Sequence, residues 1–269
     1  MFKLIKKIQF TPKENLMKSI ADTNTAIKIF NSKVSNNLKF LLYERFNWMN
    51  QFIAEKDIGL EVGSGAGFAK FFIKNKNLKL SDLSNDSHLN FKNIDAQNTG
   101  FKDESFDYVI ASNMIHHVPY PMKFFKEMNR ILKTNGKLLI FEPYCSITLQ
   151  LVTIIMRHEG FDFDVDVWDE KNPKSDENDQ WAGNIAVANL IFDNKKEFKN
   201  NLGHLFTIEF EELTECMIFL NSGGVTSKTF HIPMNNFFLN ILNSIDKILV
   251  KFFPNIFCLG RRLLLRKTK

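Results

Sequence analysis

The chain has 269 residues, of which 44% are hydrophobic and 24% are charged, and its formal net charge is +5. This composition is typical of an ordinary soluble folded protein, and the length allows one large domain or one domain with a sizeable insertion. The three cysteines lie far apart and form no CxxC pair, so their spacing argues against a zinc site or a disulfide framework and favours a reducing cytoplasm. We therefore expect no metal site.

Both ends of the chain carry basic patches, FKLIKK at residues 2–7 and RRLLLRKTK at residues 261–269. Such patches can bind nucleic acid or anionic lipid, but solvated ends are the simpler interpretation. The longest uncharged apolar run, YCSITLQLVTIIM (144–156), is too short and too polar to span a bilayer. The first residues lack the apolar core of a secretion signal. We expect a cytoplasmic protein.

The first predicted element is helical and covers residues 13–55, where apolar residues recur at helical spacing. Strands and helices then alternate. The predicted strands are DIGLEV (57–62), LKLSDLS (78–84), LNFKNIDA (89–96), FDYVIASN (106–113) and KLLIFEP (137–143). The predicted helices between them are AGFAKFFIKNK (66–76) and PYPMKFFKEMNRILK (119–133). This alternation predicts an α/β fold with a parallel sheet and helices on both faces.

The alternation breaks after residue 144. Residues 145–157 favour a helix, and the acidic and aromatic residues 160–182 favour a loop or lid. Further strand or helix segments are expected at NIAVANLIF (184–192) and LFTIEFEEL (205–213), with a last strand at RRLLLRK (261–267). We divide the chain, as one compact domain overall, into a helical segment (1–55), an alternating core (56–144), a cover or insertion (145–256), and a final strand with a basic tail (257–269).

A long amphipathic helix is predicted for NNFFLNILNSIDKILVKFF, residues 235–253. Its apolar stripe, which we expect to pack on the domain, consists of Phe238, Ile241, Ile245, Ile248 and Phe252. Lys247 and Lys251 flank this stripe, so a weak peripheral contact with a membrane surface is the alternative.

Residues 60–68 read LEVGSGAGF and place Gly63, Gly65 and Gly67 directly after a predicted strand. Glycine is needed where the backbone turns sharply and approaches a ligand without a Cβ in the way. A dinucleotide-binding loop would have glycine or alanine where Phe68 stands, and no GK[ST] follows, which excludes a P-loop. By itself the loop fits several nucleotide cofactors or a tight structural turn.

Acidic residues stand at the ends of the first three predicted strands. Glu61 comes two residues before Gly63, where a buried carboxylate is costly unless it has a partner. Asp82 follows the second strand, where a carboxylate can accept both ribose hydroxyls of a nucleoside. Asp95, followed by Ala96, ends the third strand, where an acid can accept an amino hydrogen of adenine. Each acid could instead cap a turn, but the three together favour a nucleoside site.

Four segments between residues 57 and 143 resemble the class I S-adenosylmethionine (SAM)-dependent methyltransferases of the Rossmann-like, methyltransferase-11-like family. They are GLEVGSGAG, LSDLS, NIDAQNTGFKDESFDYVIASNMIHHVPYP and FKEMNRILKTNGKLLIFEP. The resemblance implies a Rossmann-like, seven-stranded, mostly parallel sheet with helices on both faces, N-terminal helices and a C-terminal lid insertion.

The resemblance also implies SAM as the cofactor. Glu61 and the glycines would lie around its methionine part, Asp82 at the ribose, and Asp95 with Ala96 at the adenine. The backbone at Ser112 and Asn113 would line the sulfonium pocket. The full set of residues expected at SAM is Glu61, Gly63, Ser64, Gly65, Gly67, Asp82, Leu83, Asp95, Ala96, Ser112 and Asn113.

Some segments depart from the family pattern. TNG (134–136) replaces the usual PGG after the RxLK helix, and TGF (99–101) replaces LPF before the fourth strand. No [DN]PP[YF] follows the fourth strand, which argues against methylation of adenine amino groups. FEPYCS, RHEGFD and GNIAVANLIF resemble a bacterial subgroup with EP, HE and GN segments that is often linked to surface-glycan pathways.

Methyl transfer from a sulfonium depends chiefly on positioning, but a hydroxyl acceptor also benefits from a general base. The candidate catalytic residues are His116 and His117 after the fourth strand, Glu142 at the end of the fifth, and His158 after the 145–157 helix. Packing, helix capping or turn stabilisation is the structural alternative for each. The candidate substrate contacts are Glu159, Trp181 and Asn184, with core packing as the alternative for Trp181.

The sequence thus predicts a cytoplasmic SAM-dependent methyltransferase. The expected acceptor is a small polar molecule, with a hydroxyl on a sugar or surface-glycan precursor as the first choice. A quinone-type carbon, a phosphate-derived oxygen, an RNA base, or a SAM-binding protein without catalysis are the alternatives. The acidic 162–179 segment speaks against a nucleic-acid partner. The sequence leaves the oligomeric state open.

Overall fold

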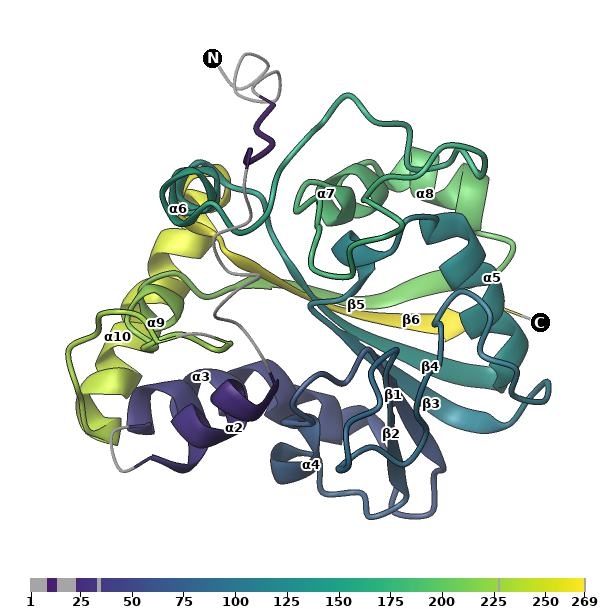
Figure 1. Cartoon of the computed structure of the whole chain (residues 1–269), viewed down its shortest axis with the longest axis horizontal. Coiled ribbons are helices and arrows are strands. Elements are labelled where there is room, and N and C mark those ends of the chain that lie inside the picture. Colours follow the sequence, from purple (N-terminus) through teal and green to yellow (C-terminus); the bar gives the residue numbers. More distant parts are fainter. Residues whose placement is uncertain (1–8, 14–22, 33–34, 227, 269) are drawn as a thin grey trace.

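The computed structural model describes residues 9–13, 23–32, 35–226 and 228–268. The basic patch at residues 2–7 and part of the 13–55 segment lie outside these residues. Within the described chain, a single twisted sheet separates two groups of helices (Figure 1).

The sheet has six strands in the order β2-β1-β3-β4-β6-β5. They are β1 (Gly59–Val62), β2 (Leu78–Ser81), β3 (Phe106–Ser112), β4 (Leu132–Pro143), β5 (Phe206–Thr214) and β6 (Gly260–Lys267). The pairs β2–β1, β1–β3 and β3–β4 are parallel, whereas β6 runs antiparallel to both β4 and β5. The prediction of a seven-stranded, mostly parallel sheet is therefore wrong: the residues that the structure describes form a mixed sheet of six strands.

The strand predicted at residues 89–96 does not form. Phe91 makes only an isolated parallel bridge to Ser81 at the end of β2. Asn93 then takes a left-handed φ of 55°, and Asp95 turns back to bridge Asn98. Because an L-residue with positive φ cannot continue an extended strand, the pairing ends after one bridge.

The helices are short apart from one. On one side of the sheet lie α5 (Pro121–Ile131), α7 (Val187–Phe192) and α8 (Lys195–Leu202), and on the other lie α2 (Thr23–Asn31), α3 (Asn36–Phe46) and α4 (Ala69–Phe72) (Figure 1). At one end gather α6 (Ile147–Met156), α9 (Met217–Leu220), α10 (Asn236–Phe252) and α11 (Pro254–Phe257). Two 3₁₀ turns complete the set, η1 (Asn47–Phe52) and η2 (Ile115–His117).

Both faces of the sheet are buried, which explains why its central strands are apolar without alternation. In β4, Leu138 and Ile140 join the core beneath α5, α7 and α8, and Leu139 and Phe141 join the core beneath α2, α3 and α4. The predicted helix at residues 66–76 shrinks to the four residues of α4.

The C-terminal basic patch is largely neutralised inside the fold. Within β6, Arg261 pairs with Asp193, and Arg262 and Arg266 each lie 2.7 Å from a β5 carboxylate, those of Glu212 and Glu209. These arginines therefore form ion pairs within the fold. Neither a solvated chain end nor a nucleic-acid contact is supported for them.

The long predicted helix is α10, but its apolar stripe faces outward. Phe238, Ile241, Ile245, Ile248 and Phe252 are 44–65% exposed, and the buried positions are instead Leu239, Asn243, Asp246 and Val250. The expected packing through the stripe is thus wrong. No helix within the described ranges has the length and apolar character needed to cross a membrane.

Candidate functional site

The carboxyl ends of three neighbouring parallel strands meet at one edge of the sheet. Val62 at the end of β1 is in register with Ser81 of β2 on one side and with Ala111 of β3 on the other. The loops that follow these strands therefore lie side by side. They carry the glycine loop (63–67), Asp82, and the Ser112–Asn113 pair, and ligands of open α/β sheets bind at this edge.

The three glycines of the loop all have left-handed backbone conformations. The φ angles are 63° at Gly63, 49° at Gly65 and 71° at Gly67. A Cβ on Gly63 would lie 2.9 Å from the Cβ of Met114, and one on Gly67 would lie 2.9 Å from Leu80 Cδ1. A Cβ on Gly65 would meet nothing within 4 Å. Two glycines are thus fixed by packing as well as by backbone conformation, and Gly65 by backbone conformation alone.

Glu61 lies beneath this loop and is only 2% exposed. Its Oε2 has no hydrogen-bond partner. Burial raises the pKa of Glu61 to about 8; the Ser64 side chain opposes the rise and the charge of Asp82 adds to it. A buried carboxyl with an unpartnered oxygen would be stabilised by a cationic group of a bound ligand.

Asp82 and Asp95 both organise the turns that contain them. Asp82 Oδ2 accepts a 2.9 Å hydrogen bond from the N–H of Gly65, and its Oδ1 accepts another from Ser84. Leu83 is half exposed beside it. Asp95 Oδ1 accepts from the N–H of Gln97 at 2.8 Å. Asp82 thus ties the glycine loop to the end of β2.

The residues at the end of β3 form a tight turn. Asn113 has a φ of 51°, donates its N–H to Phe141 O at 2.7 Å, and places its amide 3.3 Å from Ser112 Oγ. Ala96 is buried in the core under α5. The next residue after the turn, Met114, is the one that packs on Gly63.

Glu142, at the end of β4, is fully buried and fixes the turn that contains the two histidines. Its Oε1 accepts 2.8 Å hydrogen bonds from the N–H groups of Met114 and Ile115, and its Oε2 lies 2.6 Å from His116 Nδ1. Since a carboxylate can only accept, His116 Nδ1 carries a proton. With all these bonds and no exposure, Glu142 positions η2 rather than facing a substrate.

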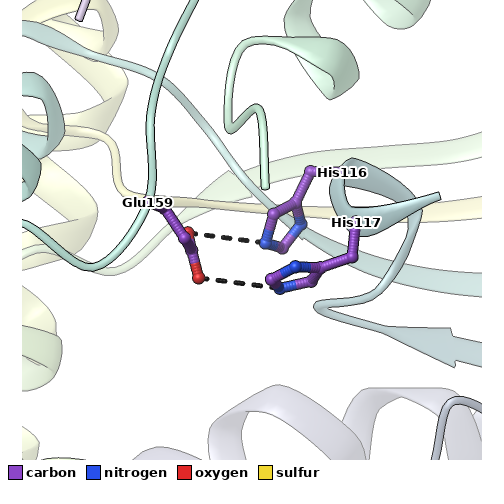
Figure 2. A group of neighbouring side chains, drawn as sticks. All are labelled: His116, His117 and Glu159. Carbon is purple, nitrogen blue, oxygen red and sulfur yellow. Dashed lines mark ion pairs between the residues drawn. The ribbon is translucent and has the colours of Figure 1, made fainter. Parts of the chain in front are cut away.

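Figure 2 shows the carboxylate of Glu159 facing the rings of His116 and His117. His116 Nε2 lies 3.6 Å from Glu159 Oε2, and His117 Nε2 lies 3.6 Å from Glu159 Oε1. His117 Nδ1 lies 3.1 Å from the carbonyl oxygen of Ala182, so this nitrogen is the protonated one and Nε2 holds the lone pair. His158 Nε2 lies 3.7 Å from Glu159 Oε1 on the solvent side.

The ionisation of this cluster follows from its charges. Burial lowers the pKa of His116, but the neighbouring carboxylates of Glu142 and Glu159 outweigh it and raise that pKa to about 10. Burial and the charge of His116 lower the pKa of His117 below its usual range. Burial would raise the pKa of Glu159, but hydrogen bonding to His116 and the nearby histidines bring it far below its usual range.

Hydrogen bonds of Asn184 hold the end of the 160–182 segment, expected from the sequence as a loop or lid, against this cluster. The Asn184 N–H donates to His116 O at 2.9 Å, and the Asn184 side-chain amide is occupied by Asp162 and Ala186. Asn184 is buried, so the expected acceptor contact is replaced by a structural one. Trp181 is partly buried, and its backbone N–H donates to Asp179 Oδ1 at 3.0 Å.

Two residues near the site, His88 and Gly183, were not predicted as site residues. His88 Nε2 lies 2.7 Å from Gly65 O, which holds the glycine loop from outside. A Cβ on Gly183 would lie 3.0 Å from His116 Cδ2 and 3.1 Å from His117 Cε1. The glycine of the GN segment was thus the available clue: it lets the lid approach both rings.

One family model matches the part of the chain that carries the candidate site. Residues 60–140 match the family model described as a methyltransferase domain. This range runs from β1 into β4 and contains the glycine loop, the strand-end acids and both histidines. The match supports the coarser prediction from the sequence: a methyltransferase of the SAM-dependent class, with SAM as the cofactor.

Individual relatives match parts of the chain. The "Ubiquinone/menaquinone biosynthesis C-methyltransferase UbiE" of Rickettsia massiliae is 28% identical over 165 residues, covering 51% of this chain and 64% of the relative. "Probable polyketide synthase 10" of Dictyostelium discoideum is 32% identical over 80 residues, covering 28% of this chain and 3% of the relative. The chain thus spans less than two thirds of the length of these curated relatives.

One solved structure shares the fold. The crystal structure of a SAM-dependent methyltransferase from Archaeoglobus fulgidus superposes with a TM-score of 0.51, covering 85% of this chain and 93% of that one. At 14% sequence identity, this likeness concerns the fold alone.

Proposed function

We propose that the protein transfers the methyl group of SAM to a hydroxyl oxygen of a small polar acceptor, and that a sugar or surface-glycan precursor carries this hydroxyl. The observation that supports it most is a contact: Gly63 of the glycine loop packs on Met114, and the His116–His117–Glu159 cluster begins two residues later. The donor loop and a group of proton-accepting side chains are therefore neighbours.

SAM would lie across the ends of β1, β2 and β3. The carboxyl of Glu61, whose Oε2 has no hydrogen-bond partner, would pair with the cationic amino-acid part, and the glycines would let the backbone come close to it. Asp82 would exchange part of its turn bonding for the ribose hydroxyls, and Asp95 with Ala96 would face the adenine. Ser112 and Asn113 would line the sulfonium, which places the methyl group near η2.

A hydroxyl needs to lose its proton as the methyl group is transferred, whereas SAM itself is already activated. His117 is the best-placed proton acceptor because Ala182 fixes its Nδ1–H and leaves the Nε2 lone pair free. His116 and Glu142 hold this arrangement from beneath, and Glu159 and His158 line its open side. The carboxylate and imidazoles together give the acceptor a polar, partly enclosed position.

A second candidate is transfer to a ring carbon, since several matching relatives are named as C-methyltransferases of ubiquinone and menaquinone biosynthesis. A quinol-type acceptor also carries hydroxyls that such a cluster could deprotonate. The two candidates differ in the product: oxygen methylation gives an ether, and carbon methylation leaves the hydroxyl count unchanged.

The test combines SAM binding with a screen for acceptors. Calorimetry should show micromolar SAM binding and no NAD binding. Nucleotide sugars, free sugars and quinols are then incubated with the protein and methyl-labelled SAM, and the labelled product is analysed by mass spectrometry. Label in a sugar ether supports the first candidate and label on a ring carbon the second. SAM binding without labelled product in any class would favour a non-catalytic SAM-binding protein.

The role of His117 has its own test. His117→Ala should lower kcat by roughly 10²–10⁴, the usual contribution of a general base, while the Kd for SAM stays within about threefold. If the variant turns over the acceptor at the wild-type rate, His117 does not accept the proton.

A further inference from the structure

Three side chains at the end of β3 present ligand atoms at metal-binding distances from one another. One atom each from His116, His117 and Glu159 lies within 4.8 Å of the other two. His116 Nε2 lies 3.6 Å from Oε2 of Glu159, and His117 Nε2 lies 3.6 Å from Oε1 of the same carboxylate. Ligands of a tetrahedral Zn²⁺ at its usual bond lengths lie roughly 3.3–3.6 Å apart. The cluster therefore needs only small shifts to enclose a cation.

The far nitrogen of each histidine is fixed as metal-binding histidines require. Nδ1 of His116 donates to Glu142, and Nδ1 of His117 donates to Ala182 O, so both Nε2 atoms point into the cluster (Figure 2). A metal-bound histidine almost always donates its other ring N–H to a carboxylate or a backbone carbonyl, which fixes the tautomer. His116 and His117 have one such partner each, a carboxylate and a backbone carbonyl.

The lid segment is built around this arrangement. The Gly160 N–H donates to Gly183 O, which fastens the residue after Glu159 to the residue after Ala182. Gly183 lies so close to both rings that a Cβ there would force them to move. Segments 115–117, 158–160 and 182–184, distant in sequence, thus come together around the three ligand atoms.

The charges also favour a cation. Two carboxylates, Glu142 and Glu159, flank the His116 ring, and no lysine or arginine pairs with either carboxylate among the described residues. A divalent cation bound at this cluster would offset the charge of these two carboxylates.

We propose that His116, His117 and Glu159 bind a divalent transition-metal cation of the Zn²⁺ type, with a coordination position left open for an acceptor oxygen. Two histidines and one glutamate plus an exchangeable fourth ligand form a known catalytic zinc set. The side chains of His117 and Glu159 are 22% and 16% exposed, so an acceptor can reach the open position. This proposal departs from our sequence-based expectation of no metal site.

The role of the cation rests on the proposed function, but its binding does not. With the cation bound, His117 Nε2 would be a ligand and no longer the proton acceptor. An acceptor hydroxyl on the metal would release its proton to water at the exposed side more readily, and its oxygen would be held near the methyl group. A third histidine, His158, lies beside the cluster with its Nε2 3.7 Å from Glu159 Oε1, and its Nδ1 has no hydrogen-bond partner.

The experiment titrates Zn²⁺ into the purified full-length chain after treatment with a chelator. One Zn²⁺ per chain is expected, and His117→Ala and Glu159→Gln should each weaken its binding at least 100-fold. His204→Ala is the matched control, because His204 is exposed and outside the cluster, and should bind as the wild type does. Retained SAM binding shows that each variant is folded.

A measurement on the wild type guards against variants that fail to fold. Co²⁺ added to the chelator-treated chain should give the visible absorption of a four-coordinate site, and Zn²⁺ should remove it. Failure of the wild type to bind either ion, or equal Zn²⁺ binding by wild type, His117→Ala and Glu159→Gln, would overturn the inference.

The outcome for the metal is separable from the outcome for the proposed function. Stoichiometric Zn²⁺ binding that depends on His117 and Glu159 supports the site even if no acceptor is labelled. Methyl transfer that proceeds unchanged in chelator, by a chain that binds no Zn²⁺, would support the proposed function and refute the metal.

Discussion

Replacing Glu61 by glutamine should stabilise the ligand-free protein at neutral pH and weaken its binding of SAM. Burial raises the pKa of Glu61 to about 8, from 4.5 in a solvated chain. The folded protein therefore holds a proton that the unfolded chain has released between these two pH values. Glu61 therefore does not lower the free energy of unfolding below pH 4.5, but it lowers it increasingly as the pH rises toward 8.

The size of the effect can be worked from these values. At pH 7, keeping Glu61 protonated costs about 3 kcal/mol, and at pH 5 it costs less than about 1 kcal/mol. Glutamine carries no such cost because its amide does not titrate. Glu61→Gln should thus gain about 1–3 kcal/mol over the wild type at pH 7 and show almost no gain at pH 5, the lower bound allowing for an imperfectly bonded amide.

Urea unfolding without SAM, at pH 5 and pH 7, measures this difference. Glu55→Gln is the matched control, since Glu55 is exposed four residues before β1 begins, and its stability change should be the same at both pH values. Calorimetry at pH 7 should show a SAM affinity about 10–100-fold weaker for Glu61→Gln, as expected when a charged partner is lost. A variant no more stable than the wild type at pH 7, or equally shifted at both pH values, would refute the reasoning.

Three further changes test other parts of the structure. Asp82→Asn should weaken SAM binding about 10–100-fold by calorimetry, because a charge-assisted contact is lost; an affinity within twofold of the wild type would exclude Asp82 from the ribose. Arg45→Met should lower the free energy of unfolding by about 3–5 kcal/mol in urea, because it leaves the buried carboxylate of Glu215 without its ion pair; a loss below about 1 kcal/mol would contradict this. Leu239→Ala should cost about 2–4 kcal/mol, whereas Ile248→Ala should change stability by less than about 0.5 kcal/mol. The reverse order in the same assay would mean that the stripe of α10 faces inward.

The sequence predicted those parts of the fold that short-range patterns determine. Apolar runs such as residues 137–143 form β4, and the glycine loop has the left-handed conformations that its glycines imply. The strand expected at residues 89–96 failed because Asn93 adopts a left-handed φ, which asparagine tolerates better than most residues. The spacing of hydrophobic residues does not show which backbone conformation Asn93 adopts.

The candidate site was only partly predictable for a different reason. Glu61, Asp82 and the glycines are close in sequence to strand ends, so topology alone gathers them. Glu159, by contrast, lies more than 40 residues after His117 and reaches it only because Gly160 and Asn184 fasten the lid to η2. The residue types made these histidines and this glutamate candidates. Only the fold showed that they form one cluster and that Glu142 binds the Nδ1 of His116.

Helix α10 shows why a periodic stripe predicts a helix better than it predicts the buried face. The helix turns Asp246 inward, where its carboxylate accepts hydrogen bonds from the N–H groups of Cys216, Met217 and Ile218 at the start of α9. Three charge-assisted bonds on one buried side chain outweigh the gain from covering a few more apolar side chains at that site. Because Asp246 and the apolar stripe lie on opposite sides of one helix, satisfying the first leaves the second exposed. The buried face of an amphipathic helix is thus set here by an acid that needs partners.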